Sequence, residues 1–421
     1  MEGEDFKSGD AAALTLILLF VLTSFSATLE VCPGCPVSGI KEAISIVREG
    51  DTIVVRGGTY REGTIEINKP LTLLGEGKPL LDGEGKHEVV RIKADRVTLK
   101  GFRVINSGRS EVEDIAGIKV EGVRDCLIEG NLLEDNFWGI YLAKVEDCRV
   151  VGNEVKGPFK VGEAYSGNGI HIWHSKRILV KDNYITGHRD GIYFEFVEDS
   201  LIEGNLAEGN WRYGLHFMFS HRDRYINNTF RKNGVGVAVM YTKKVLMKGN
   251  LFEGQWGGAS YGLLLKAIDD SLVEGNVFRK NTAGILMDEC QRTEIKRNDF
   301  IENGWALRVW ANSWNNVITG NNFLGNTFDV ATNSTMNPNR IEENYWSSYR
   351  GYDLNRDGIG DIPYRPVKLF SYIVENNPSA VVLLKSFFVE ILNVVEETLP
   401  AVISVSVEDP RPLMRRVNWK R

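Results

Sequence analysis

Four related segments lie in the middle of the chain: residues 167–174 read GNGIHIWH, 190–196 read DGIYFEF, 213–219 read YGLHFMF and 234–241 read GVGVAVMY. In each segment a glycine precedes aliphatic or Phe residues that alternate with residues of other kinds. Alternation with a period of two predicts a half-buried strand. The segments recur about every 22 residues, which predicts strands that stack, one in each repeat.

An asparagine recurs in step with these segments, three places after an aliphatic residue in most repeats. The members are Asn131, Asn153, Asn183, Asn205, Asn228, Asn250, Asn276, Asn298, Asn321 and Asn344. We expect the chain to bend at each Asn, because Asn tolerates the left-handed backbone region and stacked amides hydrogen-bond between coils. Two residues further on, an interior aromatic stack is expected from Phe230, Phe252, Phe278, Phe300 and Phe323.

The repeat predicts an all-β fold, a right-handed parallel β-helix of about 22 residues per coil over residues 37–365. An α-solenoid is excluded by the alternation. Residues 37–49 favour a short capping helix with Ser38 as its N-cap. Residues 379–399 favour one apolar helix of about five turns that docks on the C-terminal coil, a partner or a membrane-embedded subunit. The predicted partner contacts are Phe387, Phe388, Ile391 and Leu392. A basic, mobile tail is expected at 400–421.

Composition and the N-terminus bear on location. The formal net charge is −6 and no long basic run occurs, which argues against nucleic acid as a partner. Residues 11–27 are apolar and free of charge, so residues 1–27 are expected to be a signal peptide, cleaved after Ser26, or a membrane anchor. Both interpretations place the rest of the chain outside the cytoplasm.

The cysteines allow several pairings. Cys32 and Cys35 form the motif CPGC, which is a weak signal for a redox or metal pair. Cys126 and Cys148 occupy the same place in consecutive repeats, where a disulfide between coils is geometrically possible. The same column also holds Ser200, Ser271 and Thr293, so a preference for small side chains is an alternative explanation.

The outward positions of the four opening segments form two predicted columns. His171, Tyr193 and His216 stack in one; Trp173, Glu195, Met218 and Met240 stack in the other. Thioether and imidazole ligands suit Cu(I), and without a cysteine the site favours transfer over permanent binding. Trp173 is placed to cover the ion through its ring face. A patch that docks a protein is an equal alternative, because Met, Trp and Tyr also mark interfaces.

A second metal site is indicated near the end of the repeats. Residues 353–361 read DLNRDGIGD and match the first nine places of a calcium loop, with candidate ligands Asp353, Asn355, Asp357, Ile359 and Asp361. The twelfth place is Tyr364 rather than Glu, so a bidentate ligand must come from elsewhere. The alternative is a surface turn.

Enzymatic function is the first class to test, because parallel β-helices often act on polysaccharides. His188, Arg189 and Asp190 are the best catalytic triplet, but pairing of Arg189 with Asp190 is the simpler explanation. No nucleophile and base are predicted on adjacent coils. We therefore expect no enzyme, with a carbohydrate-active protein and a pure scaffold as alternatives.

Several motifs, in order, resemble the NosD family of nitrous-oxide-reductase maturation proteins: GNGIHIW, TGHRDGIYFEF, RYGLHFMFS, GVAVMY, ASYGLLLK and NYWSSYRGYDLNRDGIGDIPYRPV. The resemblance runs from about residue 37 to 415. It implies an exported, non-enzymatic partner of an ABC permease and its ATPase. Such a complex supports assembly of the copper centres of nitrous oxide reductase, with Cu(I) delivered by a lipoprotein chaperone. The segment 379–399 is then the expected permease contact.

Overall fold

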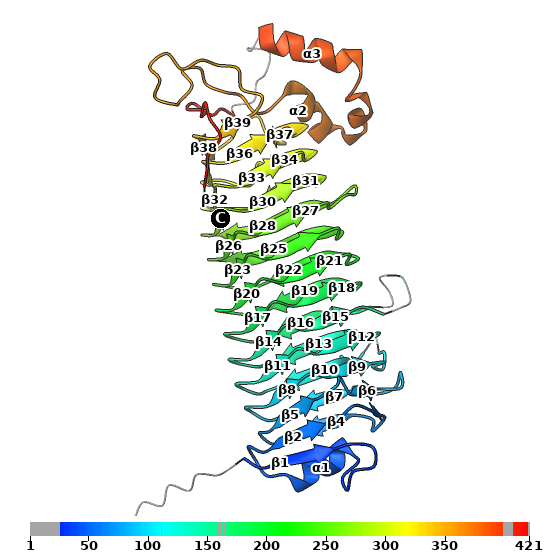
Figure 1. Ribbon diagram of the computed structural model, residues 1–421. Helices are drawn as coiled ribbons and strands as arrows, with labels where there is room; N and C mark the ends of the chain where they lie inside the picture. The colour runs from blue at the N-terminus through cyan, green and yellow to red at the C-terminus, as the bar shows by residue number, and fades with distance from the viewer. Residues whose placement is uncertain (1–25, 111, 159–161, 163–165, 399–406, 420–421) are drawn as a thin grey trace, which may run out of the picture.

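The computed structural model describes residues 26–110, 112–158, 162, 166–398 and 407–419, so the predicted signal or anchor segment lies almost entirely outside the described residues. Figure 1 shows one elongated stack of coils with helices at both ends. Within the described residues the strands form three parallel sheets of 14, 13 and 12 strands. This confirms the predicted parallel β-helix.

The strands of the three sheets have the following bounds. The first sheet contains β1 (Thr28–Val31), β2 (Thr52–Val55), β5 (Thr72–Gly75), β8 (Thr98–Lys100), β11 (Leu127–Glu129), β14 (Arg149–Val151), β17 (Leu179–Lys181), β20 (Leu201–Glu203), β23 (Arg224–Ile226), β26 (Leu246–Lys248), β29 (Leu272–Glu274), β32 (Glu294–Lys296), β35 (Val317–Thr319) and β38 (Arg340–Glu342). The second contains β3 (Thr59–Tyr60), β6 (Leu80–Asp82), β9 (Arg103–Ile105), β12 (Leu132–Glu134), β15 (Glu154–Lys156), β18 (Tyr184–Thr186), β21 (Leu206–Glu208), β24 (Thr229–Arg231), β27 (Leu251–Glu253), β30 (Val277–Arg279), β33 (Asp299–Ile301), β36 (Asn322–Leu324) and β39 (Tyr345–Trp346). The third contains β4 (Ile65–Ile67), β7 (Val90–Ile92), β10 (Ala116–Glu121), β13 (Trp138–Ala143), β16 (Ile170–Trp173), β19 (Asp190–Glu195), β22 (Tyr213–Met218), β25 (Val235–Lys243), β28 (Tyr261–Asp269), β31 (Ala283–Asp288), β34 (Trp305–Val309) and β37 (Phe328–Ala331).

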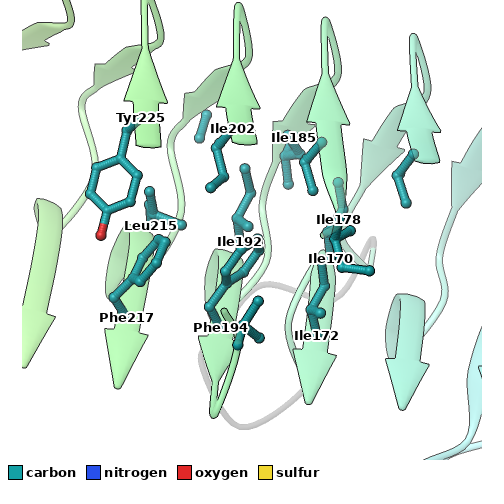
Figure 2. Packing of buried hydrophobic residues seen from close by; sticks show 14 of the residues in the cluster. Ile170, Ile172, Ile178, Ile185, Ile192, Phe194, Ile202, Leu215, Phe217 and Tyr225 are labelled. Carbon is teal, nitrogen blue, oxygen red and sulfur yellow. The ribbon is translucent and has the colours of Figure 1, made fainter. Parts of the chain in front are cut away.

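The alternating residues of the opening segments point inward as expected. Figure 2 shows Ile170 and Ile172, Ile192 and Phe194, and Leu215 and Phe217 projecting from successive strands into one core. All six are fully buried. Because the strands are in register, each coil adds the same kind of side chain at the same depth, and the core is continuous along the stack.

The asparagine ladder runs through the interior. The Asn205 backbone N–H and side-chain amide both donate to Oδ1 of Asn228, at 2.9 Å each, and Asn228 repeats this toward Asn250. We predicted that each Asn itself would be left-handed, and this is wrong. The left-handed residue is the one before it, such as Gly204 (φ +67°) or Asn227 (φ +56°). The Asn side chain turns inward to bond, and the preceding residue makes the bend. A second ladder, which the repeat analysis missed, includes Asn210 and Asn233.

The predicted phenylalanine stack is present and longer than expected. Rings of neighbouring members from Phe230 to Phe323 lie 4.6–5.6 Å apart, centroid to centroid. The stack ends on Trp346, whose ring lies 4.1 Å from that of Phe323. Trp346 donates its indole N–H to the Asp409 carboxylate at 2.9 Å, which satisfies the polar end of a buried ring.

The N-terminal cap is α1 (Ile40–Ile46), which covers the first coils. Its N-cap is Gly39, so the prediction of Ser38 as N-cap is wrong. The Glu62 carboxylate serves that purpose from the neighbouring loop, because it accepts the N–H groups of Ile40 and Lys41 at 2.8 and 3.0 Å. A long-range acceptor near the helix N-terminus also complements its dipole.

Two disulfides and one buried free cysteine occur among the described residues. Cys126 and Cys148 are bonded across neighbouring coils, with Cα atoms 4.5 Å apart, and both are fully buried. The disulfide explanation for this column therefore holds for these two coils, while small polar residues such as Ser200 occupy it further on. Cys32 and Cys35 are bonded to each other in the loop before α1.

The C-terminal cap is built from α2 (Leu369–Asn376), a 3-10 helix η2 (Pro378–Leu383) and α3 (Phe387–Thr398). The expected single helix over 379–399 is therefore wrong, since the chain turns between η2 and α3. Phe370 of α2 packs on Phe328 of the last coil, and Val389 of α3 joins the same cluster. Leu369 and Tyr372 of α2 pack against the main core, so α2 covers part of its end.

The C-terminal segment is ordered over residues 407–419, in contrast to the mobile tail that we expected. The Asp409 carboxylate accepts the backbone N–H groups of Glu343 and Asn344, at 3.1 and 3.0 Å, and so continues the asparagine ladder beyond its last member. Arg416 pairs with Asp299 at 2.8 Å, and the Val417 N–H donates to Asn322. The segment thus runs back along the outside of the coils.

Candidate metal site

The outward positions of β16, β19, β22 and β25 form the two predicted columns. We call Tyr141, His171, Tyr193 and His216 the histidine column. We call Trp173, Glu195, Met218 and Met240 the methionine column. In each column, successive members are direct partners in the parallel register. Tyr141 belongs here although the sequence reading left it out, because an insertion separates its repeat from the next.

His171 points outward but is buried, with 8% of its surface exposed. Its ring is stacked between those of Tyr141 and Tyr193, each 4.7 Å away, and the Trp138 ring meets it edge-on. The Asn168 amide lies 3.0 Å from its Nδ1. Burial, followed by the positive charge of Arg189, lowers the pKa of His171 to about 3, so the ring is neutral and its Nδ1 can accept a hydrogen bond from the Asn168 amide.

His216 is also buried, at 5% exposure, and it faces a carboxylate rather than open solvent. Its Nδ1 lies 3.6 Å from Oδ2 of Asp190, which is completely buried. The other carboxylate oxygen of Asp190 lies 3.6 Å from the Nε of Arg212. Asp190 is therefore held between two nitrogen-bearing groups on the next coil. At 3.6 Å this contact is too long for a hydrogen bond, and both ring nitrogens of the buried His216 lack a hydrogen-bond partner.

The methionine column is the accessible part of the site. All four of its side chains are half-buried. The Tyr193 hydroxyl donates to Sδ of Met218 at 3.6 Å, which links the two columns. Burial, followed by the negative charge of Glu195, raises the pKa of Tyr193 to about 12, so the hydroxyl keeps its proton at neutral pH. The Met218 thioether and the Glu195 carboxylate thus lie beside a protonated phenol, and Met240 is the register partner of Met218 on the next strand.

The donor set suits a soft monovalent ion better than a hard divalent one. Thioether groups select Cu(I), whereas imidazole also suits zinc and calcium requires several oxygen ligands, so the methionines make the set specific for a soft ion. In the described part of the chain, no three His, Cys, Asp or Glu side chains converge as a metal site would require. The Lys144 ammonium group lies 5.5 Å from the centroid of the Trp173 ring, so that ring already interacts with a cation.

An exposed aromatic stack borders the methionine column and was missed by the sequence reading. It consists of His174, Phe196, Phe219 and Tyr241, whose neighbouring rings lie 4.5–5.3 Å apart. Each adopts a positive φ, which bulky residues rarely do. The equivalent residues in other coils are Gly122, Lys144, Ala267 and Glu289. The position directly follows the fourth place of each segment, so extending the alternation by one residue would have revealed it.

The triplet 188–190 does not form a catalytic arrangement. His188 is completely buried, its Nδ1 lies 3.1 Å from the Ser166 hydroxyl, and burial lowers its pKa to about 4. Arg189 reaches Oδ1 of Asn168 at 3.3 Å rather than pairing with Asp190. The expected Arg189–Asp190 pair is thus replaced by contacts from Asp190 to the neighbouring coil.

The proposed calcium ligands lie in one loop and bond to its own backbone. Asp353 accepts the N–H groups of Asp357 and Gly358, and Asp361 accepts that of Leu354. Asp357 accepts the N–H of Ile359, and the Asn355 amide bonds to Asp357. Tyr364, at the twelfth place, points away and bonds to Ser348 at 2.6 Å. Calcium binding stays a prediction.

The proposed docking residues divide between two faces of α3. Phe387 is 75% exposed, and Phe388 and Ile391 are also exposed, together with Val394. Leu392 packs instead against the cluster around Phe370 and Val389. Figure 1 places α3 at the end of the molecule, beyond α2 and the last coils.

Comparisons with known proteins identify the family. A family model described as "Periplasmic copper-binding protein (NosD)" matches residues 155–355, which include the methionine column and all of the histidine column except Tyr141. A protein of Pseudomonas aeruginosa named "Probable ABC transporter binding protein NosD" is 31% identical over 371 residues, which cover 84% of this chain and 86% of that protein. The chain belongs to the NosD family. A protein of the same name from Stutzerimonas stutzeri is 29% identical, over 85% of each chain.

The solved structures similar to this NosD-family chain support the fold only. The catalytic unit of a GH87 α-1,3-glucanase from Streptomyces thermodiastaticus aligns with a TM-score of 0.57 and 14% identity, over 73% of this chain and 62% of that one. At this identity the likeness shows a shared β-helix and nothing of the glucanase's chemistry. The family relatives are named as transporter binding proteins, which supports an accessory role.

Family membership also bears on location and cargo. The family description is periplasmic and copper-binding, which supports an extracytoplasmic location and copper as the metal. Among the described residues, no helix combines the length and apolar character needed to cross a membrane.

Proposed function

We propose that this chain is an extracytoplasmic accessory protein of an ABC-transporter complex that receives Cu(I) and passes it on. In this proposal its partners are the permease and its ATPase, nitrous oxide reductase, whose copper centres are assembled, and a lipoprotein that donates copper. The NosD family and the names of its relatives support the transporter and copper parts. The carbohydrate-active alternative receives no support beyond the shared fold.

The observation that carries the proposal is the pair Met218 and Met240 on adjacent strands, beside Glu195 and the Tyr193 hydroxyl. Adjacent strands lie about 4.8 Å apart, so two flexible methionine side chains on them can reach the same ion. Without a thiolate at this face, binding is weak enough to release the ion to a stronger acceptor. Such a site suits transfer.

The histidine column offers a second set of ligands on the same strands. His216 precedes Met218 by two residues, about 7 Å along the strand. Asp190 faces its Nδ1, which leaves Nε2 for a metal. Because the aromatic rings around His171 and His216 bury them, we assign first contact with the ion to the methionine column.

The test measures Cu(I) affinity of residues 28–421 by competition with a chromophoric chelator in ascorbate. The variant Met218→Leu/Met240→Leu keeps the side-chain volume and removes both sulfurs, so we expect Cu(I) to bind at least about tenfold more weakly. The matched control is Met336→Leu, an exposed methionine in a distant loop, which should bind as the parent does.

Unchanged affinity in the double variant, with the parent's melting temperature, would remove the methionine column from the proposal. His216→Ala then decides whether the histidine column alone holds the ion. If neither variant changes Cu(I) binding, the two columns form a protein-docking patch.

For the permease contact, we propose the exposed face of α3. Phe387→Ser/Ile391→Ser removes apolar surface without touching Val389, which packs on the last coil. Co-purification of the permease and ATPase with this variant should fall strongly. Val382→Ser, at an equally exposed residue of η2, is the control. Full retention of the complex by the α3 variant would make the helix only a cap.

A further inference from the structure

The motif CPGC forms a tight turn whose geometry does not depend on its disulfide. The Cys35 N–H donates to the carbonyl of Cys32 at 3.0 Å, and Gly34 has φ +94°. Proline in the second place and a left-handed glycine in the third are the residues that a type II turn requires. This turn holds the Cα atoms of the two cysteines 5.1 Å apart, so the thiols stay adjacent when the bond is reduced.

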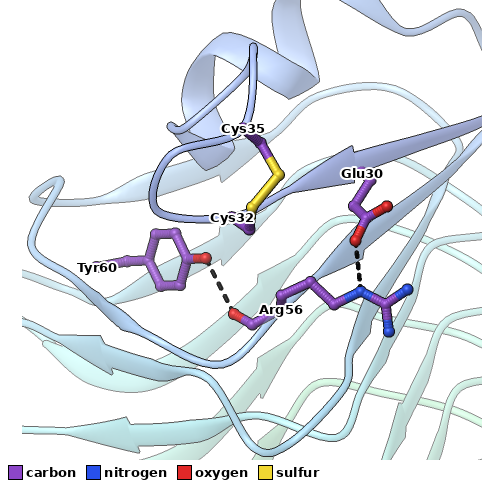
Figure 3. The surroundings of a disulfide bond; sticks show 5 residues. All are labelled: Glu30, Cys32, Cys35, Arg56 and Tyr60. Atoms are coloured by element: carbon purple, nitrogen blue, oxygen red, sulfur yellow. Dashed lines mark hydrogen bonds and ion pairs between the residues drawn. A yellow bond between two sulfur atoms is a disulfide. The ribbon is translucent and has the colours of Figure 1, made fainter.

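The turn is also anchored to the next coil by contacts that involve no sulfur. A Cβ at Gly58 would lie 2.9 Å from Cγ of Pro33, which shows how closely the backbone there packs on the proline ring. The Tyr60 hydroxyl donates to the carbonyl of Arg56 at 3.0 Å, and the Arg56 guanidinium is bonded to Glu30 (Figure 3). None of these contacts uses a sulfur atom, so we expect them to persist when the disulfide is opened.

The two disulfides of the chain differ in access. Cys126 and Cys148 are completely buried between coils. Cys32 and Cys35 are half-buried in a loop whose Pro33 and Gly34 are exposed, at the end of the molecule that α1 caps. An external thiol can therefore reach the CPGC bond without unfolding the protein, whereas the other bond is shielded by the core.

We propose that Cys32 and Cys35 are a reversible dithiol–disulfide pair whose reduced form is a second Cu(I) site. A partner dithiol reduces the pair by exchange: the Cys32–Cys35 bond breaks, a disulfide forms in the partner, and two thiols with their protons are left on this chain. Cu(I) then binds both sulfurs as thiolates, and two protons are released to solvent. Oxidation of the pair abolishes the site.

The chemistry selects Cu(I) because two adjacent thiolates are soft ligands, stronger than the thioethers of the methionine column. The identity of this metal rests on the proposed function, while the exchange step does not. The cysteine pair directly follows β1, and β17 belongs to the coil that carries Trp173, the first member of the methionine column. Six strand spacings separate β1 from β17 in the first sheet, about 29 Å. The pair and the methionine column therefore cannot share one ion.

The first measurement tests exchange on the folded chain, residues 28–421. Mild treatment with dithiothreitol followed by a maleimide mass tag, without denaturant, should label Cys32 and Cys35 and leave Cys126, Cys148 and Cys290 unlabelled. Peptide mapping reads out the positions. Failure to label the pair under conditions that reduce an exposed model disulfide would overturn the proposal.

The second measurement compares Cu(I) stoichiometry before and after reduction, with the thiol reagent removed and ascorbate keeping copper reduced. The reduced chain should bind about one more Cu(I) ion per molecule than the oxidised chain. Both Cys32→Ser/Cys35→Ser and reduced parent protein blocked with iodoacetamide should lose that increment. The blocked sample needs no substitution, so it keeps the test valid if the variant folds poorly.

The variant Met218→Leu/Met240→Leu separates this inference from the proposed function. It should lose copper at the methionine column and keep the increment from the reduced pair. If no reduced sample binds additional Cu(I), the second site is ruled out, and the methionine column is not affected by that result. If the reduced pair adds a copper ion and the methionine variant binds as much copper as the parent, the second site stands and the methionine column is removed from the proposed function.

Discussion

Phe278 and Phe219 both stack on aromatic neighbours in the same solenoid, but in opposite settings. Phe278 is fully buried, with the rings of Phe252 and Phe300 at 4.6 and 5.0 Å. Phe219 is exposed between Phe196 and Tyr241, at 5.3 and 5.0 Å, and its backbone is left-handed. The inner stack fills a core that every coil must fill. The outer one occurs beside the candidate metal site and takes a backbone state that suits glycine better.

The difference teaches where function is to be sought in a repeat protein. A feature that recurs in each coil is explained by stacking. A feature confined to a few coils, and costly in exposed apolar surface and backbone strain, needs another reason. By that criterion the outer stack and the methionine column belong together.

The largest expected effect comes from breaking the inner stack. Phe278→Ala should lower the free energy of unfolding by about 4 kcal/mol, because it removes a buried ring and leaves a cavity between two others. Chemical denaturation measures this. Cu(I) affinity of the folded protein should not change; a weaker affinity would mean that the core and the outer face are coupled.

Next come the two disulfides. In the chain-entropy model, opening the Cys126–Cys148 loop costs about 3.4 kcal/mol, whereas the short Cys32–Cys35 loop is worth about 2 kcal/mol. Cys126→Ser/Cys148→Ser should therefore melt clearly lower than Cys32→Ser/Cys35→Ser. Equal losses would contradict the contrast between a structural bond and an exchangeable one.

A similar effect is expected from the buried histidine. Because the pKa of His188 falls from 6.5 to about 4 on folding, the folded state favours the neutral ring. Above pH 6.5 the titration of His188 costs the folded state nothing. Below pH 6.5 the unfolded chain binds the proton more readily, so the free energy of unfolding decreases as the pH falls, by about 3 kcal/mol at pH 4. His188→Gln should flatten the pH dependence of stability in that range. The exposed His87→Gln is the control, and a parallel flattening there would refute the assignment.

The smallest effect is expected at the outer stack. Phe219→Asn loses ring contacts but gains a residue that tolerates the left-handed backbone, so stability should change by less than about 1 kcal/mol. Denaturation under the same conditions as for Phe278→Ala makes the comparison direct. A loss as large as that of the inner ring would make the outer stack a structural element.

Much of this architecture can be predicted from the sequence, because the alternation with a period of two and the repeat length constrain every coil in the same way. The buried asparagines and phenylalanines could be assigned to ladders from their spacing. The errors lie where the repeat ends or where one coil meets another. Glu62 caps α1 from a neighbouring loop, and the residue before each Asn makes the bend, neither of which the spacing specifies.

The candidate site shows the same division. The sequence placed His171, His216, Met218 and Met240 outward within four successive strands of one sheet, and the register agrees. It did not indicate that Tyr141 and Tyr193 cover His171, that Asp190 faces His216, or that the Tyr193 hydroxyl bonds to Met218. Those contacts join residues from different coils through side-chain direction.

The sequence by itself determined the coil, its inward and outward positions and the methionines and histidines of the outer face, because alternation and period act along the chain. Only the tertiary structure decided how deep the histidines lie, that the C-terminal helix breaks in two, and that residues 407–419 pack back on the coils. Burial and pairing depend on what neighbouring coils place beside each residue, and that information is not local. The CPGC turn combines both: its residues dictate the bend, and the surrounding coil leaves its bond within reach of solvent.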